Sequence, residues 1–350
     1  MSHDLKFLEY KMVLYMRLNI YNMFKGVINK MKTKKIFLLL IAIILLLVFP
    51  ACAVEPNTIE SPDEPGPYHV GHYKVSYVVP PYGRYWATIR YPATRDGWFA
   101  PIDTTEAPYP GIVVSNGLFG SEWNIKWIPK HLTTYGYVTL CFSPPKKIFF
   151  ETTQWAYGII GGIEKLKSHN DRLLSPIKGM VDVETFGGIG LSMGGGGCIE
   201  ATGAPDSEID AAVALAPADS DESIDAAKNI SVPIQLQVGA NDGMVEPHEV
   251  IPYYNDFIPD TTVKEYLSIT GGNHIGFVDE FAARFAEWIG MDNPKGISFA
   301  EQRRISRKYF TAWFQYHLKG LDDYYTYIFG DEAQKDLDAG VLTELLYNIP

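Results

Sequence analysis

The chain has 350 residues, of which 47% are hydrophobic and 20% are charged, and its formal net charge is -11. A chain of this length and composition can bury one large core, and a single α/β domain of about 250 residues fits within it. The acidic balance argues against a nucleic-acid partner, which requires a basic surface, and three cysteines imply no disulfide framework.

The amino-terminal region has the pattern of an export signal. Residues 31–35 are basic, residues 36–49 form an uninterrupted apolar run, and Ala51-Cys52-Ala53 is a small-residue cleavage pattern. Cleavage after this pattern is the first interpretation. Two alternatives stay open: lipid attachment at Cys52, and an uncleaved membrane anchor, since the apolar run extended to Val54 approaches the ~20 residues that span a bilayer.

The next segments predict a tether followed by a layered α/β domain. Residues 55–71 are rich in Pro, Glu and Asp, which is typical of a disordered linker. Residues 73–79 and 84–91 alternate between apolar and polar side chains, which predicts two antiparallel strands joined at Pro80-Pro81-Tyr82-Gly83. Strand and helix patterns then alternate as far as His317, which predicts a mostly parallel central sheet with helices on both faces.

The stretch around Ser192 is typical of a nucleophile elbow. It reads Gly190-Leu191-Ser192-Met193-Gly194 and lies between the apolar run 185–189 and a Gly-rich helix start. In such a turn the serine leaves a strand and enters a helix with a strained backbone, so glycine is needed two positions to either side. The strain lifts the hydroxyl clear of the sheet.

Two later strands end in residues that would complete a catalytic set. Residues 233–238 predict a buried strand that opens into Asn241-Asp242, and residues 265–269 run into Gly271-Gly272-Asn273-His274. Serine, aspartate and histidine therefore follow the chain order of an α/β-hydrolase triad. A serine hydroxyl needs a neutral imidazole to take its proton, and a buried carboxylate fixes the imidazole tautomer.

The developing oxyanion needs two aimed N–H groups. One donor is expected to be the amide of Met193, which follows the nucleophile at the start of a helix whose dipole favours negative charge. The other normally comes from the loop after an earlier strand. Residues 111–115 predict that strand and Asn116-Gly117-Leu118-Phe119-Gly120 follows it, so the amide of Leu118 is the second candidate.

Each of these residues has a competing interpretation. The elbow lacks the Lys-Ser/Thr of a P-loop, and it fails the dinucleotide fingerprint because Met193 stands where the third glycine should be. Asn-Asp-Gly is strong turn chemistry, and Asp219 is a rival acid. His248 is a rival base, although it follows Asp242 too closely to occupy a separate strand end. Cys141 and Cys198 lie in apolar or helical surroundings and are expected to be small core residues.

The Ser-Met-Gly-Gly-Gly-Gly run at 192–197, with Asn116-Gly117-Leu118 and Ile125-Lys126-Trp127, resembles the bacterial cutinase and polyester hydrolase branch of the α/β hydrolases. It is more loosely similar to the dienelactone hydrolases. The similarity covers residues 73–318. It implies the α/β-hydrolase fold, a serine esterase that uses no cofactor or metal, and an acyl-ester substrate.

The resemblance also indicates where this chain departs from plastic-degrading members. It places Leu118, Leu191 and Ala218 where those members have aromatic cleft residues, and the two-cysteine staple near the histidine loop is absent. Short aliphatic esters are therefore expected to react faster than bulky aromatic polyesters. The candidate substrate-binding residues are Gly117, Phe119, Leu191, Ala218 and Val245.

The sequence as a whole is interpreted as an exported serine carboxylic-ester hydrolase, extracellular or attached to the cell surface, that acts on short or polymeric esters. The alternatives are a dienelactone hydrolase-like or acyl-transferring enzyme, and a non-catalytic binding protein on the same fold. The oligomeric state stays open. The predicted segments are an extension or gene-start artefact at 1–30, a signal peptide at 31–53, a disordered linker at 54–71, the catalytic domain at 72–320 and a tail at 321–350 with a helix over 331–342.

Overall fold

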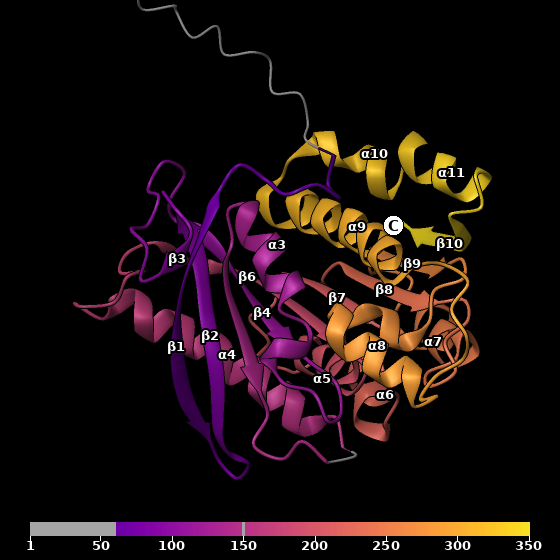
Figure 1. Cartoon of the computed structure of the whole chain (residues 1–350), viewed down its shortest axis with the longest axis horizontal. Coiled ribbons are helices and arrows are strands. Elements are labelled where there is room, and N and C mark those ends of the chain that lie inside the picture. The colour runs from indigo at the N-terminus through magenta and orange to yellow at the C-terminus, as the bar shows by residue number, and fades with distance from the viewer. Residues whose placement is uncertain (1–60, 149–150) are drawn as a thin grey trace, which may run out of the picture. The chain divides into compact units, whose positions relative to one another are not determined.

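The computed structural model describes residues 61–148 and 151–350 (Figure 1). The predicted export signal and the extension before it lie outside these described residues. Within the described ranges, no helix combines the length and the apolar character that a membrane crossing requires.

A ten-stranded sheet forms the centre of the described part, in the order β10-β9-β8-β7-β6-β4-β5-β2-β1-β3. Neighbours from β5 through β4, β6, β7 and β8 to β9 run parallel. The hairpin β1–β2 joins antiparallel to β5, and β10 joins antiparallel to β9. The strands are β1 His69–Val79, β2 Gly83–Ala93, β3 Gly97–Trp98, β4 Tyr109–Ser115, β5 Val138–Ser143, β6 Val181–Leu191, β7 Ala211–Leu215, β8 Ile234–Gly239, β9 Lys264–Ile269 and β10 Leu342–Asn348.

The burial of each strand explains its position in the sheet. Every residue of β4, β7, β8 and β9 is buried, as expected for parallel strands covered on both faces. The β1–β2 pair keeps exposed positions along its length. The predicted α/β sheet and the predicted hairpin, whose last pair is Val79 with Gly83, are both confirmed.

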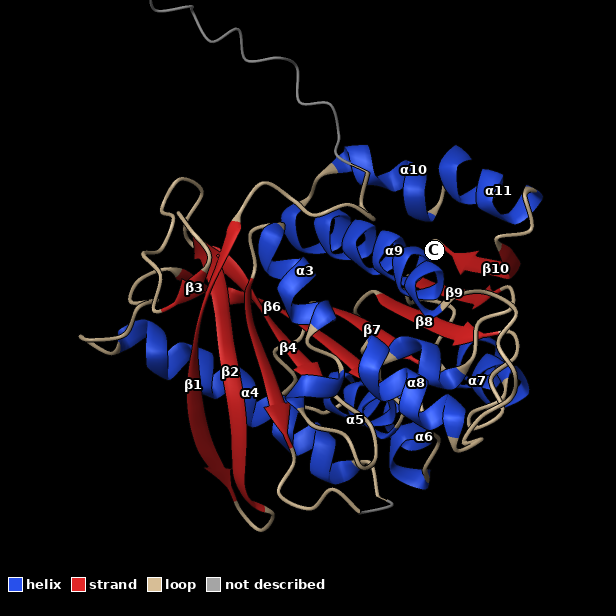
Figure 2. Ribbon diagram, viewed as in Figure 1, coloured by secondary structure: helices blue, strands red, loops and turns tan. Residues whose placement is uncertain are grey.

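Helices cover both faces of the sheet. In Figure 2, α3 and α9 lie over the near face, and α4 and α5 lie behind the strands. Helix α5 follows β6 directly, so its amino-terminal end stands at the carboxyl edge of the parallel strands. The α-helices are α3 Trp127–Thr134, α4 Thr153–Asp171, α5 Met193–Thr202, α6 Asp221–Ala227, α7 Pro247–Pro252, α8 Glu280–Trp288, α9 Phe299–Lys319, α10 Tyr325–Ile328 and α11 Asp331–Asp338. Short 3-10 turns are η1 Glu122–Asn124, η3 His274–Phe277 and η4 Asp322–Tyr324, and η2 Tyr253–Phe257 is a π-helix.

The described part of the predicted linker, residues 61–71, is packed rather than disordered. Asp63 is buried and pairs with Arg304 of α9 at 2.7 Å. The carbonyl of Pro62 lies 3.0 Å from Nε2 of His131 in α3, and β1 begins at His69. A Pro- and acid-rich composition suggested a tether, but specific partners on α3 and α9 hold the segment in place.

The predicted tail also joins the fold. The helix expected over 331–342 ends at Asp338, since Gly340 takes the left-handed conformation with φ of +70° and the chain turns back. Leu342 then starts β10, which pairs antiparallel with β9 and completes that edge of the sheet. The segment after residue 320 is therefore part of the same layered structure.

Candidate active site

Ser192 lies on a sharp turn between β6 and α5, with φ of 58° and ψ of -124°. A Cβ at Gly190 would lie 1.9 Å from the carbonyl oxygen of Gly194, and one at Gly194 would lie 2.3 Å from that of Asn116. Both positions therefore require glycine, for the steric reason that the G-x-S-x-G pattern predicts. The Ser192 N–H donates to the carbonyl of Leu215 at 2.9 Å, which fixes the turn against β7.

Asp242 and His274 form a buried pair at the ends of β8 and β9. Nδ1 of His274 lies 2.9 Å from Oδ2 of Asp242, and both residues are buried. The second carboxylate oxygen of Asp242 accepts from the N–H groups of Met244 at 3.0 Å and Val245 at 2.8 Å. Because Nδ1 faces the carboxylate, Nε2 of His274 is left for the pocket.

The pair also sets the basicity of the ring. Burial alone would lower the pKa of His274, but the carboxylate of Asp242, with a smaller contribution from Asp292, raises it above its ordinary value. A raised pKa makes the imidazole a stronger base for the Ser192 proton.

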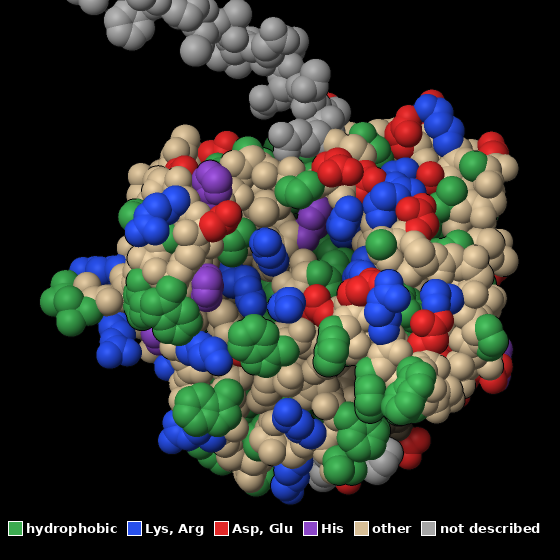
Figure 3. Space-filling model, viewed as in Figure 1, with side chains coloured by type: hydrophobic (Ala, Val, Ile, Leu, Met, Phe, Trp, Pro, Cys, Tyr) green, Lys and Arg blue, Asp and Glu red, His purple; other side chains and the backbone are tan. Residues whose placement is uncertain are grey.

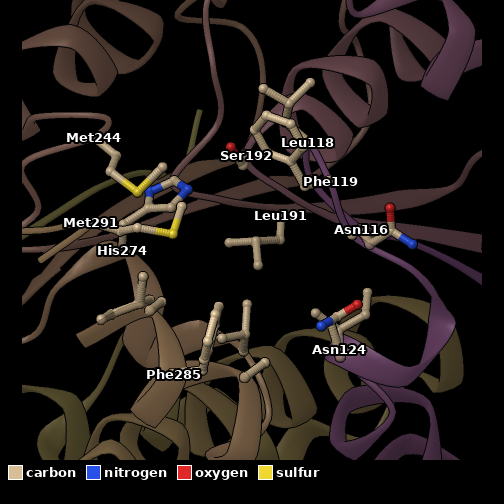
Figure 4. Close-up of a pocket in the computed structure, with 17 residues that line it drawn as sticks. Asn116, Leu118, Phe119, Asn124, Leu191, Ser192, Met244, His274, Phe285 and Met291 are labelled. Atoms are coloured by element: carbon tan, nitrogen blue, oxygen red, sulfur yellow. The ribbon is translucent and has the colours of Figure 1, made fainter. Parts of the chain in front are cut away.

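A pocket of about 370 Å³ brings Ser192 and His274 together. Figure 4 shows both at one wall, with Phe285 and Asn124 at the opposite wall. Among the described residues the Ser192 hydroxyl forms no hydrogen bond with the ring, and such bonds are often long before substrate binds. The lining residues are Asn116, Gly117, Leu118, Phe119, Gly120, Asn124, Ile125, Leu191, Ser192, Met244, His274, Ile275, Val278, Ala282, Phe285, Ala286 and Met291.

Two backbone N–H groups beside Ser192 have no acceptor in the described part of the chain: those of Leu118 and Met193. The neighbouring amides are used, since Phe119 N donates to Lys147 O at 2.8 Å and Gly120 N donates to Gly117 O at 3.1 Å. The loop lies against the serine, because a Cβ on Gly117 would be 2.8 Å from Cβ of Ser192. The Asn116 side chain anchors it by donating to Phe142 O at 2.8 Å.

The rival acid and base lie elsewhere. Asp219 is exposed and does not line the pocket. His248 is also exposed, and its Nδ1 lies 3.2 Å from Glu246 in a surface pair. The geometry therefore favours Asp242 and His274 over these alternatives.

The predicted substrate-binding residues divide into two groups. Gly117, Phe119 and Leu191 line the pocket, but Ala218 and Val245 do not. Ala218 N donates to Ser192 O at 3.0 Å, so the backbone of this residue stabilises the turn that carries Ser192. Val245 is buried and its N–H holds the Asp242 carboxylate. Both were placed by sequence position, which does not reveal that their backbone groups face inward.

Sequence reasoning missed a strap formed by residues 291–297. Oδ1 of Asp292 accepts from Gly243 N at 2.9 Å and Oδ2 accepts from Ile275 N at 3.0 Å, so one carboxylate joins the loops of Asp242 and His274. The Asn273 side chain donates to Asn293 O at 2.8 Å within the same strap. An isolated Asp in a Gly- and Pro-containing loop gives no signal of this role.

Helix α8 was missed as well. It supplies Ala282, Phe285 and Ala286 to the pocket, and the strap adds Met291. Figure 3 shows hydrophobic side chains gathered over this helix and over the loops beside it. The apolar spacing within residues 281–288 is the signal that could have identified a pocket wall.

The comparison with known families agrees with this geometry. The family model described as PET hydrolase-like matches residues 55–292, which is more than half of the chain. The chain belongs to the PET hydrolase-like family. The matched span contains Ser192, Asp242 and His274 and ends at Asp292. The predicted relationship to the polyester hydrolase branch of the α/β hydrolases is thereby confirmed.

The chain is also similar, at low identity, to individual curated proteins. The chain is 25% identical over 178 residues to bis(hydroxyethyl) terephthalate hydrolase of Streptomyces coelicolor, covering 50% of this chain and 54% of the relative. It is 27% identical over 173 residues to cutinase est1 of Thermobifida alba, covering 47% and 53%. For cutinase 1 of Thermobifida cellulosilytica the values are 25% over 170 residues, covering 47% and 60%. The chain spans about half the length of the first two relatives.

Proposed function

We propose that this chain is a serine carboxylic-ester hydrolase. Ser192 is the nucleophile, His274 the general base and Asp242 the carboxylate that orients the ring. One observation carries the proposal: the buried His274–Asp242 pair, at 2.9 Å, opens into the pocket that also holds Ser192 on its strained turn. Three residues distant in the sequence supply the nucleophile, the base and the orienting group of acyl transfer.

The reaction proceeds in two halves. Nε2 of His274 takes the Ser192 proton as Oγ attacks the ester carbonyl, and the oxyanion is held by the N–H groups of Leu118 and Met193. The tetrahedral species collapses to an acyl-enzyme as His274 gives its proton to the leaving alcohol. Water then attacks the acyl carbon with His274 as base, which releases the acid and restores Ser192.

The proposed substrates are carboxylic esters, either small molecules or accessible groups of a polymer. The names of the relatives, a bis(hydroxyethyl) terephthalate hydrolase and two cutinases, support an ester of this kind. Aliphatic esters are proposed to react faster than aromatic polyesters, because the described lining is mostly aliphatic, with Leu118 and Leu191 in place of rings, and Phe119 and Phe285 are the phenyl side chains left for stacking.

Replacing the nucleophile tests the proposal. Ser192→Ala should reduce turnover of p-nitrophenyl esters by several orders of magnitude, since the triad acts as a unit. Asp219→Asn and His248→Gln serve as controls and should keep wild-type turnover, because neither residue lines the pocket. Retained turnover in Ser192→Ala would overturn the assignment of the nucleophile. Loss of turnover in Asp219→Asn or His248→Gln would overturn the choice of Asp242 or His274 over that rival.

Export is proposed as well, from the basic, apolar and small-residue pattern of residues 31–53. The mature protein from its native host should then begin near Val54. Terminal sequencing that recovers Met1 or Met31 on the functional protein would contradict a cleaved signal.

A further inference from the structure

Helix α8 lies beside the pocket of the proposed nucleophile and packs there through a small hydrophobic core. That core consists of Ile275, Ala283, Ala286 and Phe299 and is separate from the main core of the domain. The amino-terminal end of the helix is tied to the loop on the other side of the pocket, since Asp279 N donates to Asn124 O at 2.6 Å. Arg303 of α9 donates to Val278 O at 2.7 Å. The helix is therefore a fixed wall.

One face of this wall is turned to the pocket. Ala282, Phe285 and Ala286 line it, and their spacing of three and four positions puts them on one side of the helix. Two of the three are alanines, whose small side chains leave pocket space that a larger side chain at the same position would occupy. Neighbouring Arg284 is exposed and does not line the pocket.

The chemistry of the lining restricts the ligand. None of the lining residues in the described chain is Lys, Arg, Asp or Glu, and the polar ones besides Ser192 and His274 are Asn116 and Asn124. A charged acyl group would lose its hydration here with no opposite charge to replace it. The volume, about 370 Å³, lies near the lower end of ligand pockets, which suits one chain of moderate length.

The proposed reaction orients the substrate within this space. The oxyanion points to the N–H groups of Leu118 and Met193, and the leaving alcohol must stay near Nε2 of His274 to receive its proton. The acyl carbon chain is the remaining substituent, and the pocket offers it the space beside Leu191, between Ser192 and Phe285 (Figure 4).

We infer that this apolar space is an acyl-chain subsite, and that the enzyme takes esters of uncharged, linear aliphatic acids of medium length in preference to acetyl esters. Ala282 and Ala286 of α8 determine how long the chain can be. The inference rests on the proposed ester hydrolase function and names its substrate class.

Kinetics with p-nitrophenyl esters from acetyl to dodecanoyl test it. Each buried methylene can add up to about fourfold in binding, so wild-type kcat/KM should rise at least about tenfold from acetyl to hexanoyl. Ala282→Trp places a large side chain in the pocket and should lower the ratio of kcat/KM for the octanoyl ester to that for the acetyl ester at least about tenfold. Ala282→Leu should give a ratio between those of Ala282→Trp and wild type. This smaller change keeps the test valid if the tryptophan variant does not fold.

A matched control places the same new side chain on the same helix away from the pocket. Arg284→Trp should keep the octanoyl-to-acetyl ratio within about twofold of wild type. A flat wild-type acyl series, a benzoyl ester preferred to the octanoyl ester, or an Ala282→Leu profile equal to wild type would overturn the subsite. A second series uses acetyl esters of alcohols of increasing length. If wild-type kcat/KM depends on the length of the alcohol and Ala282→Trp removes that dependence, the pocket holds the alcohol and the acyl assignment is overturned.

These results are distinct from failure of the proposed function. If no ester shows turnover that depends on Ser192, the hydrolase proposal itself fails. If turnover depends on Ser192 but ignores acyl length, the acyl subsite alone is wrong.

Discussion

Asp292 is the residue that most clearly couples separate parts of the site. Its two carboxylate oxygens accept from Gly243, next to Asp242, and from Ile275, next to His274. Burial lowers the pKa of His274, and the carboxylate of Asp242 raises it. Asp292 adds a smaller contribution that also raises it. We interpret Asp292 as a positioning residue, because it acts through the backbone and charge of its neighbours.

Asp292→Asn should lower kcat about tenfold with little change in KM. Asparagine keeps one acceptor but loses the charge and the second acceptor, and a hydrogen bond to a charged group is worth about 1.5–3 kcal/mol. The pH dependence provides a readout that a general loss of structure would not give. Neutral His274 is the proposed base, so activity falls as the pH drops below its raised pKa, and the variant should move this acid limb to lower pH.

Asp219→Asn is the matched control for that experiment, because it removes an exposed carboxylate that does not line the pocket. Its acid limb should coincide with that of wild type. An Asp292→Asn enzyme with an unchanged acid limb and unchanged kcat would show that the strap does not position the pair.

At the level of single residues, the sequence could predict that Ser192, Asp242 and His274 lie at the carboxyl ends of strands, because each follows a recognisable strand pattern. It could not predict Asp292. The bond from Gly243 to Asp292 joins residues 49 positions apart, and only the folded chain brings them together. Ala218 and Val245 do not line the pocket, for the related reason that a side chain's direction in a loop is set by tertiary contacts.

Among the elements, β9 shows how far burial overrides composition. Its six residues include Lys264, Glu265 and Ser268, yet all are buried. Glu265 accepts a hydrogen bond from Gln235, and its other oxygen has no partner in the described residues. Burial raises the pKa of Glu265 well above its ordinary value, which favours the protonated form of this carboxyl in the folded protein.

This protonation makes stability depend on pH. Above the ordinary pKa the unfolded chain releases the Glu265 proton while the folded chain keeps it, so the free energy of unfolding falls as pH rises, by up to about 1.4 kcal/mol per pH unit. Glu265→Gln should flatten that fall at pH values above the ordinary pKa of a glutamate, measured by urea unfolding. The exposed Glu64→Gln control should leave it unchanged. Equal slopes in wild type and Glu265→Gln would contradict a protonated Glu265.

The same element scale shows what the sequence could establish about the fold. Continuous apolar runs predicted the parallel strands, and alternating residues predicted the β1–β2 hairpin. Helix α8 and strand β10 were missed because each depends on a partner: α8 on its small core with Phe299, and β10 on the edge of β9. A short segment completed by a distant neighbour carries little periodicity of its own.

Over the whole molecule, the described chain is one layered α/β structure in which residues after 320 complete the sheet. Removal of residues 321–350 would expose the edge of β9 and the packed face of α9, so these residues belong to the folded unit and not to a dispensable tail. The layers bring the carboxyl ends of β6, β8 and β9 to one edge, where Ser192, Asp242 and His274 lie.

The central claim, that Ser192 is the activated nucleophile of an ester hydrolase, is tested most directly by covalent trapping. A p-nitrophenyl alkylphosphonate should release one p-nitrophenol per chain, add one phosphonyl group to the intact mass and abolish ester turnover in proportion. Peptide mass spectrometry should place the group on Ser192, and Ser192→Ala should take up none. Inactivation with the label on a different serine, or full ester turnover by a chain labelled at Ser192, would contradict the account.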